Sequence, residues 1–571
     1  MNASATDRAK APLAAGAVLT ALLLASTAAA QPVQLTPPPQ QSPAQQAPAG
    51  APTRLVPFGQ TPPFTQTPAP TAPAGIQVEA LGALSADTGG PLTPANGGLP
   101  AEAWAGTARP LADGLIATLP EQVRSAALRR ALVRLFLSDL VPPAGSGGDR
   151  GFAGRRLEAL ARTGLLDAAR DLAVAVPPSL DDGPAALALF QGRVLAGDTD
   201  TACLDGPDYV KRFADPAFQK LMIACQVRNG ETAAATLGVD MLREQGNLDE
   251  PFLLLAESAA AGRTAAVKGV ARPTPTQLAL ILASKRSPDA ETRVTAPASL
   301  VALARAAEAP MPLRLAAAEQ AAMLGLLAPA DLGAVYQSVS IPAADLKDPL
   351  TAVQKRSGAQ ARALLVQALR NADSIGVKAE LLRAAVDAGD AALLSGSYGA
   401  VLMQEIGQVP PGIAYGFLAP FAARVSLLQG RVDLARAWVE IARADAVSGN
   451  ADPVPYQRLW PIALLNGLAR PGDMPMEEWL AGVGAVPEDA DATARAGSVL
   501  ALLAAAGQPV DPAVADSLLL RSMGTAPTLG GGGQGGGADA GGAAGRIDPL
   551  VAARLGDAAA QGRMGETLLL T

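Results

Sequence analysis

Histidine is missing from this sequence, and aromatic residues are rare. Without histidine, the 571-residue chain cannot form a Ser-His-Asp triad, a Cys-His dyad or a His-ligated metal site. Any catalysis would have to use carboxylates, lysine, tyrosine, serine or an external cofactor. Aromatic residues make up 3% of the chain although 49% of it is hydrophobic, so alanine and leucine must form the core through close helix packing. The composition predicts an all-α protein and indicates no catalytic residue, metal site or cofactor.

Lysine and long apolar runs are also scarce. Only eight of the 45 basic residues are lysine, which we interpret as a mark of a GC-rich genome rather than of chemistry. The net charge is −7, so nucleic acid and anionic lipid surfaces are not expected as partners. Beyond the first thirty residues no segment approaches about twenty uninterrupted apolar residues, so we expect no membrane insertion of the remaining chain.

Residues 1–30 have the pattern of a secretory signal. Arg8 and Lys10 give a basic start, an apolar run follows, and the alanines at 28–30 form a small-residue cleavage motif. Cleavage after Ala30 would release a periplasmic or secreted protein into an oxidising compartment. The alternative is an uncleaved signal anchor, because the apolar run approaches bilayer length. No cysteine follows that run directly, so a lipoprotein anchor is not expected.

Shifts in composition divide the rest of the chain. Pro, Gln, Ala and Thr dominate the first segment, which predicts a disordered tether, and glycine dominates a later linker. Between them the pattern is helical. The predicted segments are a tether (31–74), an N-terminal cap (75–143), tetratricopeptide-like repeats (150–270), further helical hairpins (271–524), a Gly-rich linker (525–545) and a C-terminal helix (546–571).

A glycine followed five residues later by alanine recurs through the helical region. The first three glycines are spaced by 33 residues, a period typical of stacked-helix arrays. In a helical hairpin the glycine forms the turn, and the small alanine in the second helix lets the two helices approach closely. The pattern therefore predicts hairpins that bury apolar surface against their neighbours. The pairs are Gly164/Ala169, Gly197/Ala202, Gly230/Ala235, Gly325/Ala330 and Gly430/Ala435.

Two of these turns resemble the tetratricopeptide repeat. The segment 427–438 reads LLQGRVDLARAW and the segment 160–169 reads LARTGLLDAA, both similar to the turn and second helix of that family. The chain departs from the family by lacking its tryptophan and tyrosine in the first helix, and its period loses register after about Gly262. The resemblance implies a right-handed α-solenoid with a concave surface for protein or peptide binding.

The layout also resembles a group of exported, alanine-rich proteins from GC-rich Gram-negative bacteria, some of which are named antifreeze glycopeptide polyprotein. We interpret that name as a reflection of amino-acid composition, not of function. Binding to ice would need a flat, regular array of threonines, whereas the threonines here are scattered through the chain.

Beyond residue 273, apolar periodicity broken by Pro and Gly predicts a further series of helices. They are expected at 276–286, 297–308, 312–325, 329–339, 357–370, 377–388, 391–406, 412–429, 431–446, 456–468, 475–483, 491–506 and 511–522, with a last helix near 548–561.

The only two cysteines, Cys203 and Cys225, fall in adjacent helices of neighbouring repeat units. In an oxidising compartment two cysteines so placed are expected to pair as a structural disulfide. Two buried free thiols are an alternative. A further alternative is that the two cysteines form a redox-active pair, although the sequence has no C-x-x-C motif.

One string, Ser397 to Gln404, is similar to the signature of soluble lytic transglycosylases, which are periplasmic enzymes. That family has a catalytic glutamate followed by serine a short way upstream, whereas Glu380 here precedes leucine, and the spacing within the string is one residue short. Glu380 as general acid is therefore one alternative. The other alternative is that the string is an ordinary helix with small residues on one face.

Paired carboxylates and tryptophans admit a structural and a functional interpretation. Asp181-Asp182 and Glu477-Glu478 are expected as solvated charges in the first turns of helices, not as acid/base pairs or a metal site. Trp438, Trp460 and Trp479 either line a concave binding surface or pack in the core.

The sequence alone thus favours a non-enzymatic periplasmic scaffold that binds an envelope protein or peptide. One alternative is an enzyme, or an enzyme accessory, acting on peptidoglycan or polysaccharide. A second alternative is a structural envelope protein without a specific ligand.

Overall fold

The computed structural model describes residues 87–246, 249–263, 265–449, 452–482, 490–516 and 549–570. In these ranges the protein is all-helical and contains no strand, as the composition predicts. The predicted signal (1–30), tether (31–74) and Gly-rich linker (525–545) lie outside the described residues. No helix in the described ranges is long and apolar enough to cross a membrane.

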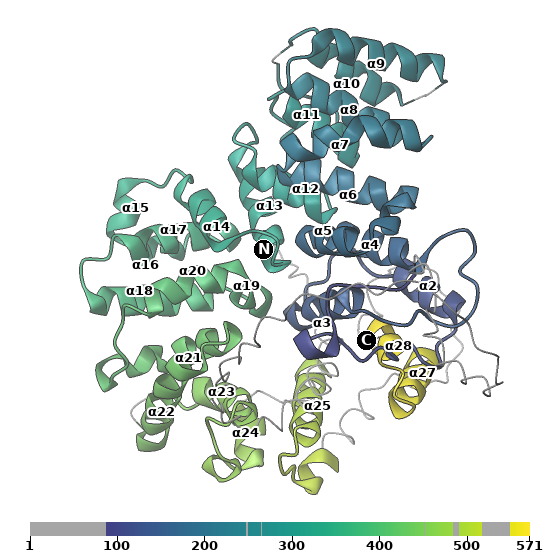
Figure 1. The fold of residues 1–571 in the computed structure, drawn as a ribbon. Coiled ribbons are helices and arrows are strands. Elements are labelled where there is room, and N and C mark those ends of the chain that lie inside the picture. The colour runs from purple at the N-terminus through teal and green to yellow at the C-terminus, as the bar shows by residue number, and fades with distance from the viewer. Residues whose placement is uncertain are drawn as a thin grey trace, which may run out of the picture.

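The N-terminal cap is a short helical unit whose helices α2 and α3 lie to the right of the middle of the ribbon in Figure 1. An isolated backbone bridge joins Leu92 to Ser138, and another joins Ala108 to Ala144. The segments before α2 and after α3 are therefore held together beside these helices. Ser125 caps the second α-helix by accepting a hydrogen bond from the backbone amide of Leu128. The helices of the cap are η1 (Pro94–Asn96), α2 (Arg109–Ala117) and α3 (Ala126–Leu137).

The predicted glycine turns each join two antiparallel helices. All five glycines have positive φ, between 67° and 93°, a conformation that favours glycine. Four of the five paired alanines are fully buried, whereas Ala330 is exposed at the start of its helix. The hairpins are α4 (Phe152–Arg162) with α5 (Leu166–Ala175), α6 (Gly183–Ala196) with α7 (Thr199–Arg212), α8 (Pro216–Arg228) with α9 (Thr232–Glu244), α13 (Met311–Met323) with α14 (Pro329–Gln337), and α21 (Ala419–Leu428) with α22 (Val432–Ser448).

The order of packing departs from a single uninterrupted stack. Helices α4, α6 and α8 pack in sequence, with η2 (Pro177–Asp181) between the first two hairpins and α10 (Glu250–Ala260) beside α9 at the far end. The chain then turns back, because α11 (Pro275–Ala283) packs on α8 and α12 (Pro297–Arg305) packs on α6. Irregular segments before and after α11 allow this reversal, which the sequence pattern did not predict.

The remaining helices form a second series that curves round the other side of the molecule (Figure 1). Two predicted helices are each broken in two: the one at 391–406 divides at Gly396, and the one at 412–429 begins as a 3-10 turn. At Gly396 an added Cβ would lie 2.4 Å from the carbonyl oxygen of Ala322, so the backbone bends where it touches α13. The helices are α15 (Ala343–Lys347), α16 (Pro349–Val353), α17 (Gly358–Arg370), α18 (Ile375–Asp387), α19 (Ala391–Ser395), α20 (Ser397–Ile406), η3 (Ile413–Leu418), α23 (Val454–Leu465), η4 (Pro471–Asp473), α24 (Met476–Gly482) and α25 (Ala490–Ala505).

The C-terminal region contains two helices where one was expected. They are α27 (Pro549–Ala560) and α28 (Met564–Leu570), and α28 packs on α2 and α3 of the N-terminal cap. Glu566 is fully buried there, accepts a hydrogen bond from Thr107 and pairs with Arg554 and Arg563. The last helices therefore close the molecule by docking on its first ones.

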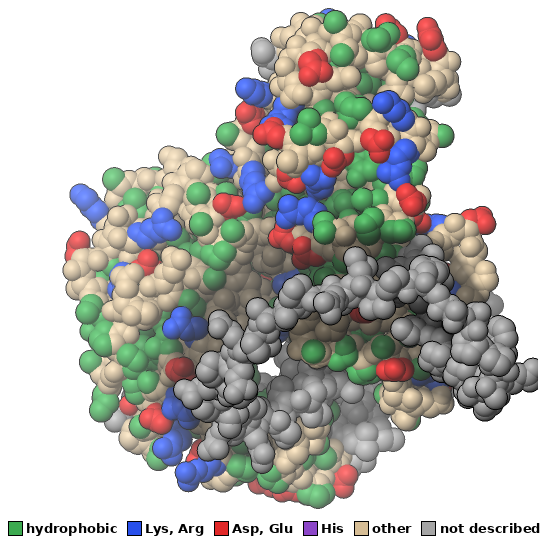
Figure 2. Space-filling model, in the orientation of Figure 1, with side chains coloured by type: hydrophobic (Ala, Val, Ile, Leu, Met, Phe, Trp, Pro, Cys, Tyr) green, Lys and Arg blue, Asp and Glu red, His purple; other side chains and the backbone are tan. Residues whose placement is uncertain are grey.

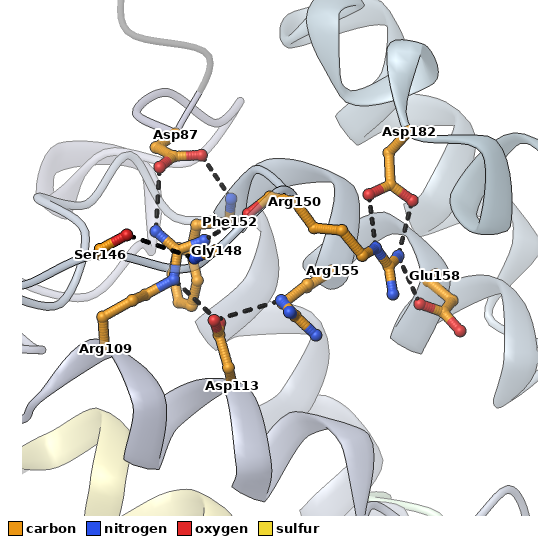
Figure 3. A network of polar contacts seen from close by, with 10 residues as sticks. All are labelled: Asp87, Arg109, Asp113, Ser146, Gly148, Arg150, Phe152, Arg155, Glu158 and Asp182. Atoms are coloured by element: carbon orange, nitrogen blue, oxygen red, sulfur yellow. Dashed lines mark hydrogen bonds and ion pairs between the residues drawn. The ribbon is translucent and has the colours of Figure 1, made fainter.

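A network of charged side chains fixes the cap to the first hairpins (Figure 3). Arg109 in α2 is buried and donates to Asp87 and Asp113, each at 2.9 Å. Arg150 bridges Asp182, at the start of α6, and Glu158 of α4 at 2.6 and 2.7 Å. Because several of these groups are buried and share partners, the network is worth more than isolated surface ion pairs.

The predicted disulfide is confirmed. Cys203 in α7 and Cys225 in α8 are bonded, with their Cα atoms 5.8 Å apart. Cys225 is buried, and Cys203 packs against the same apolar core. The bond joins two consecutive hairpins of the first series.

Replacing both cysteines with alanine is expected to lower the free energy of unfolding by about 3 kcal/mol, because the bond closes a loop whose chain entropy is then released. Guanidinium denaturation monitored by circular dichroism measures the effect. Reduced wild-type protein is the control and should match the variant. An unchanged midpoint in both samples would contradict a stabilising role for the bond.

Candidate functional site

The middle of the molecule contains two adjoining cavities, which together we call the central hollow. Their volumes are about 590 and 570 Å³. Both are lined by Val133 of α3, Leu165 before α5 and Gly325 between α13 and α14. In Figure 1, α3 and α19 face each other on opposite sides of the middle of the ribbon. Segments far apart in the sequence therefore line two neighbouring cavities, both open to solvent, that share these three residues.

Two glycine turns allow the walls of the hollow to meet closely. At Gly164 an added Cβ would lie 2.7 Å from a Leu326 methyl carbon and 2.9 Å from Cβ of Pro297. At Gly325 it would lie 2.8 Å from Nη2 of Arg129. Both glycines also have positive φ, so each position needs glycine for its backbone conformation as well as for the close approach.

Three arginines of α3 line the larger cavity, which we call the arginine cavity. Arg129 donates from Nη1 to the carbonyl oxygen of Met323 at 3.3 Å and so joins α3 to the end of α13. Arg134 donates from Nε to the carbonyl oxygen of Gly97 at 2.7 Å. Arg130 is exposed to the cavity. Within the described part of the chain, none of the three forms an ion pair, and the lining residues include no Asp or Glu.

The arginine cavity is consequently electropositive. Burial lowers the pKa of Arg129, and the charge of neighbouring Arg130 lowers it further. Three backbone carbonyl oxygens, those of Val123, Arg124 and Met323, accept hydrogen bonds from its Nη1, but no carboxylate of a described residue pairs with it. Guanidinium groups offer planar donor pairs that match carboxylate and phosphate oxygens. The arrangement is suited to binding an anionic group.

The wall opposite α3 is polar but uncharged. Gln429 donates from Nε2 to the carbonyl oxygens of Leu394 and Gly396, at 2.7 and 3.1 Å, and Ser397 donates to the carbonyl oxygen of Leu327. These bonds fix the junction between α19 and α20. This wall therefore adds hydrogen-bonding groups to the cavity without neutralising the arginines.

The smaller cavity carries charges of both signs, and we call it the mixed-charge cavity. Arg193 pairs with Asp198 at 3.0 Å, and Arg305 pairs with Asp331 at 2.9 Å and also donates to the end of α6. Although burial acts to raise the pKa of Asp198, its hydrogen bonds from Thr201 and Arg193 outweigh that effect and lower it. Figure 2 shows such basic and acidic side chains intermixed over α5, α6 and α12.

The three tryptophans do not form a binding surface. Trp438, Trp460 and Trp479 are 0%, 1% and 1% exposed, and the rings of Trp460 and Trp479 lie 6.4 Å apart in the core. The expectation of a concave aromatic surface is thus wrong, because α22, α23 and α24 bury all three rings in one apolar core. The core-packing alternative is confirmed.

The residues considered for acid/base chemistry occupy structural positions or lie on the surface. Glu380 is exposed on α18, while Ser397 and Tyr398 are buried in α20. Asp182 caps α6 by accepting from the backbone amide of Ala185, but its side chain is 6% exposed and paired with Arg150, so the expectation of a solvated charge is wrong for it. Glu477 and Glu478 lie in the first turn of α24, as predicted. In the described ranges no group of three or more potential metal ligands occurs.

No family model, no curated protein and no solved structure matches the chain.

Sequence reasoning missed the arginine cavity. Arg129, Arg130 and Arg134 stand among the apolar residues of a predicted helix and look like ordinary solvated charges. The one signal in the sequence is that no acidic residue occurs within α3 to pair with them. What makes them a site is the approach of α13, α19 and α20, which depends on the reversal of the chain.

Proposed function

We propose that the chain is a periplasmic helical-repeat scaffold that binds a protein or peptide of the cell envelope in its central hollow. The observation that carries this proposal is the hollow itself, which is open to solvent and lined by helices from both series. Spaces of this kind between stacked helices are a common place for repeat proteins to hold partners. The proposal includes no catalytic step by the chain.

Two further features support the proposal. The glycine hairpins agree with tetratricopeptide-like units, and we propose that they are short solenoid segments of that type on either side of the reversal. The disulfide agrees with export to an oxidising compartment, as expected from a signal at 1–30 cleaved after Ala30. No partner has to enter a membrane for this function.

Site-specific photo-crosslinking in intact cells tests the function. A photoreactive residue at Val133, in the hollow, is expected to give a reproducible adduct with one envelope protein identified by mass spectrometry. The matched control is Val174 on α5, which is 82% exposed and does not line the hollow. Equal adducts at both positions would argue against a specific site in the hollow.

The same experiment separates the alternatives. Glycan fragments on the adduct would favour an enzyme or enzyme accessory acting on peptidoglycan, and Glu380→Gln should then abolish muropeptide release. A complete lack of adducts at both positions would favour a structural envelope protein without a ligand.

A further inference from the structure

The arginine cavity has charge and space that the described residues do not use. Arg129 and Arg134 each use part of their guanidinium groups on backbone carbonyls, and Arg130 makes no hydrogen bond to any described residue. Concentrating three cations on two turns of one helix is unfavourable unless solvent or a ligand compensates them. The helix spans 12 residues, so this charge is a property of its side chains and not of its terminus.

The shape of the hollow restricts the ligand. Each cavity by itself falls within the range of small-ligand pockets, about 300–1,000 Å³. The two adjoin through Val133 and Leu165, so a ligand longer than one small molecule can extend from the arginine cavity into the mixed-charge cavity. Leu326 and Val301 add apolar surface to the second part. A site with one basic end, an apolar floor and a second polar end suits an extended peptide.

We propose that the arginine cavity binds carboxylate groups of an acidic peptide segment of the partner, with the rest of that segment lying along the mixed-charge cavity. This inference rests on the proposed function only in taking the ligand to be a peptide. Arg130 and the free donors of Arg129 hold the carboxylates, while Arg134 is oriented by the carbonyl groups of Gly97 and Gly98.

Fluorescence anisotropy on the full chain, with labelled hexaglutamate as the probe, tests the proposal. Wild-type protein is expected to bind hexaglutamate and not hexaglutamine or hexalysine, and binding should weaken as salt screens the charges. The triple variant Arg129→Gln, Arg130→Gln, Arg134→Gln should bind at least tenfold more weakly. The control variant Arg431→Gln, Arg436→Gln, Arg458→Gln removes the same charge from exposed positions outside the hollow and should bind like wild type.

A second variant protects the test against misfolding. Because Arg130 is exposed and forms no hydrogen bond or ion pair with a described residue, Arg130→Glu should retain the wild-type circular dichroism spectrum and denaturation midpoint and still bind hexaglutamate at least tenfold more weakly. Equal binding by wild type and Arg130→Glu would overturn the proposal. So would a wild-type protein that binds inorganic pyrophosphate and not hexaglutamate, since the site would then recognise phosphate.

The outcomes also distinguish this inference from the proposed function. A specific adduct at Val133 together with no hexaglutamate binding would leave the scaffold standing and remove the acidic-peptide site. Charge-dependent hexaglutamate binding with no adduct at Val133 in cells would keep the site and remove the proposed envelope scaffold.

Discussion

Replacing Glu319 with alanine is expected to lower the free energy of unfolding by about 3–5 kcal/mol. Glu319 of α13 is 6% exposed and accepts two hydrogen bonds from Arg362 of α17, at 2.7 and 2.6 Å. The hydroxyl of Tyr336 donates to the same carboxylate at 2.8 Å. Removing the carboxylate leaves a cation and a hydroxyl group in the core without their acceptor, so the cost greatly exceeds that of a surface pair.

The pH dependence of this effect follows from the pKa shifts. Burial acts to lower the pKa of Arg362, but the bonds to Glu319 outweigh burial and raise it. Burial and the nearby Glu319 charge raise the pKa of Tyr336 well above its usual value. A raised folded-state pKa contributes stability below the unfolded pKa, about 10 for tyrosine, and loses it as pH rises further. The loss caused by Glu319→Ala should therefore stay constant between about pH 7 and 9.

Guanidinium denaturation of the variant and of two controls measures this prediction. Tyr336→Phe keeps the ion pair and should cost only about 1 kcal/mol. The double variant Glu319→Leu, Arg362→Met removes both charges together and should recover much of the loss, because no unpaired cation remains. If Glu319→Ala is as stable as Tyr336→Phe, the ion pair between Glu319 and Arg362 does not hold α13 and α17 together.

Gly399→Ala is expected to lower the free energy of unfolding by about 3 kcal/mol. An added Cβ in α20 would lie 1.8 Å from the carbonyl oxygen of Leu394 and 2.7 Å from Nε2 of Gln429. The first neighbour is backbone, so relief requires α19 to move away from α20. That movement would also disturb the bonds from Gln429 that fix this junction.

The matched control is Gly114→Ala in α2. Nothing lies within 4 Å of a Cβ at that exposed position, so the change should instead stabilise the protein by about 0.5–1 kcal/mol through helix propensity. Thermal and guanidinium denaturation compare the two. Effects of the same sign and size would mean that the close contact at Gly399 is unimportant.

Local features of the fold were predictable because they depend on a few neighbouring residues. Gly164 and Gly430 marked hairpin turns, since positive φ and the sequence spacing are both local properties. Cys203 and Cys225 paired because consecutive hairpins lie side by side. The pair Gly325/Ala330 was predicted in the same way, and its turn is correct although its alanine faces solvent.

Features set by distant contacts were not predictable. The reversal at α11 and α12 depends on how irregular segments fold back, and apolar periodicity gives the buried face of a helix but not its partner. The arginines of α3 became a site only through that reversal. For Trp438 the sequence left a binding surface and the core both open, because a large ring suits either environment, and the structure places it in the core at 0% exposure.

The docking of α28 on the N-terminal cap joins the two most distant parts of the described chain. Thr107 and Glu566 are hydrogen bonded across 459 residues, and Gly565 lies so close to Trp104 that an added Cβ would come within 2.6 Å of its ring. Local hairpins close more quickly than contacts over such a span, so we expect this contact to form after them. A variant without α28 is therefore expected to expose the part of the Trp104 ring that Gly565 covers in the folded protein.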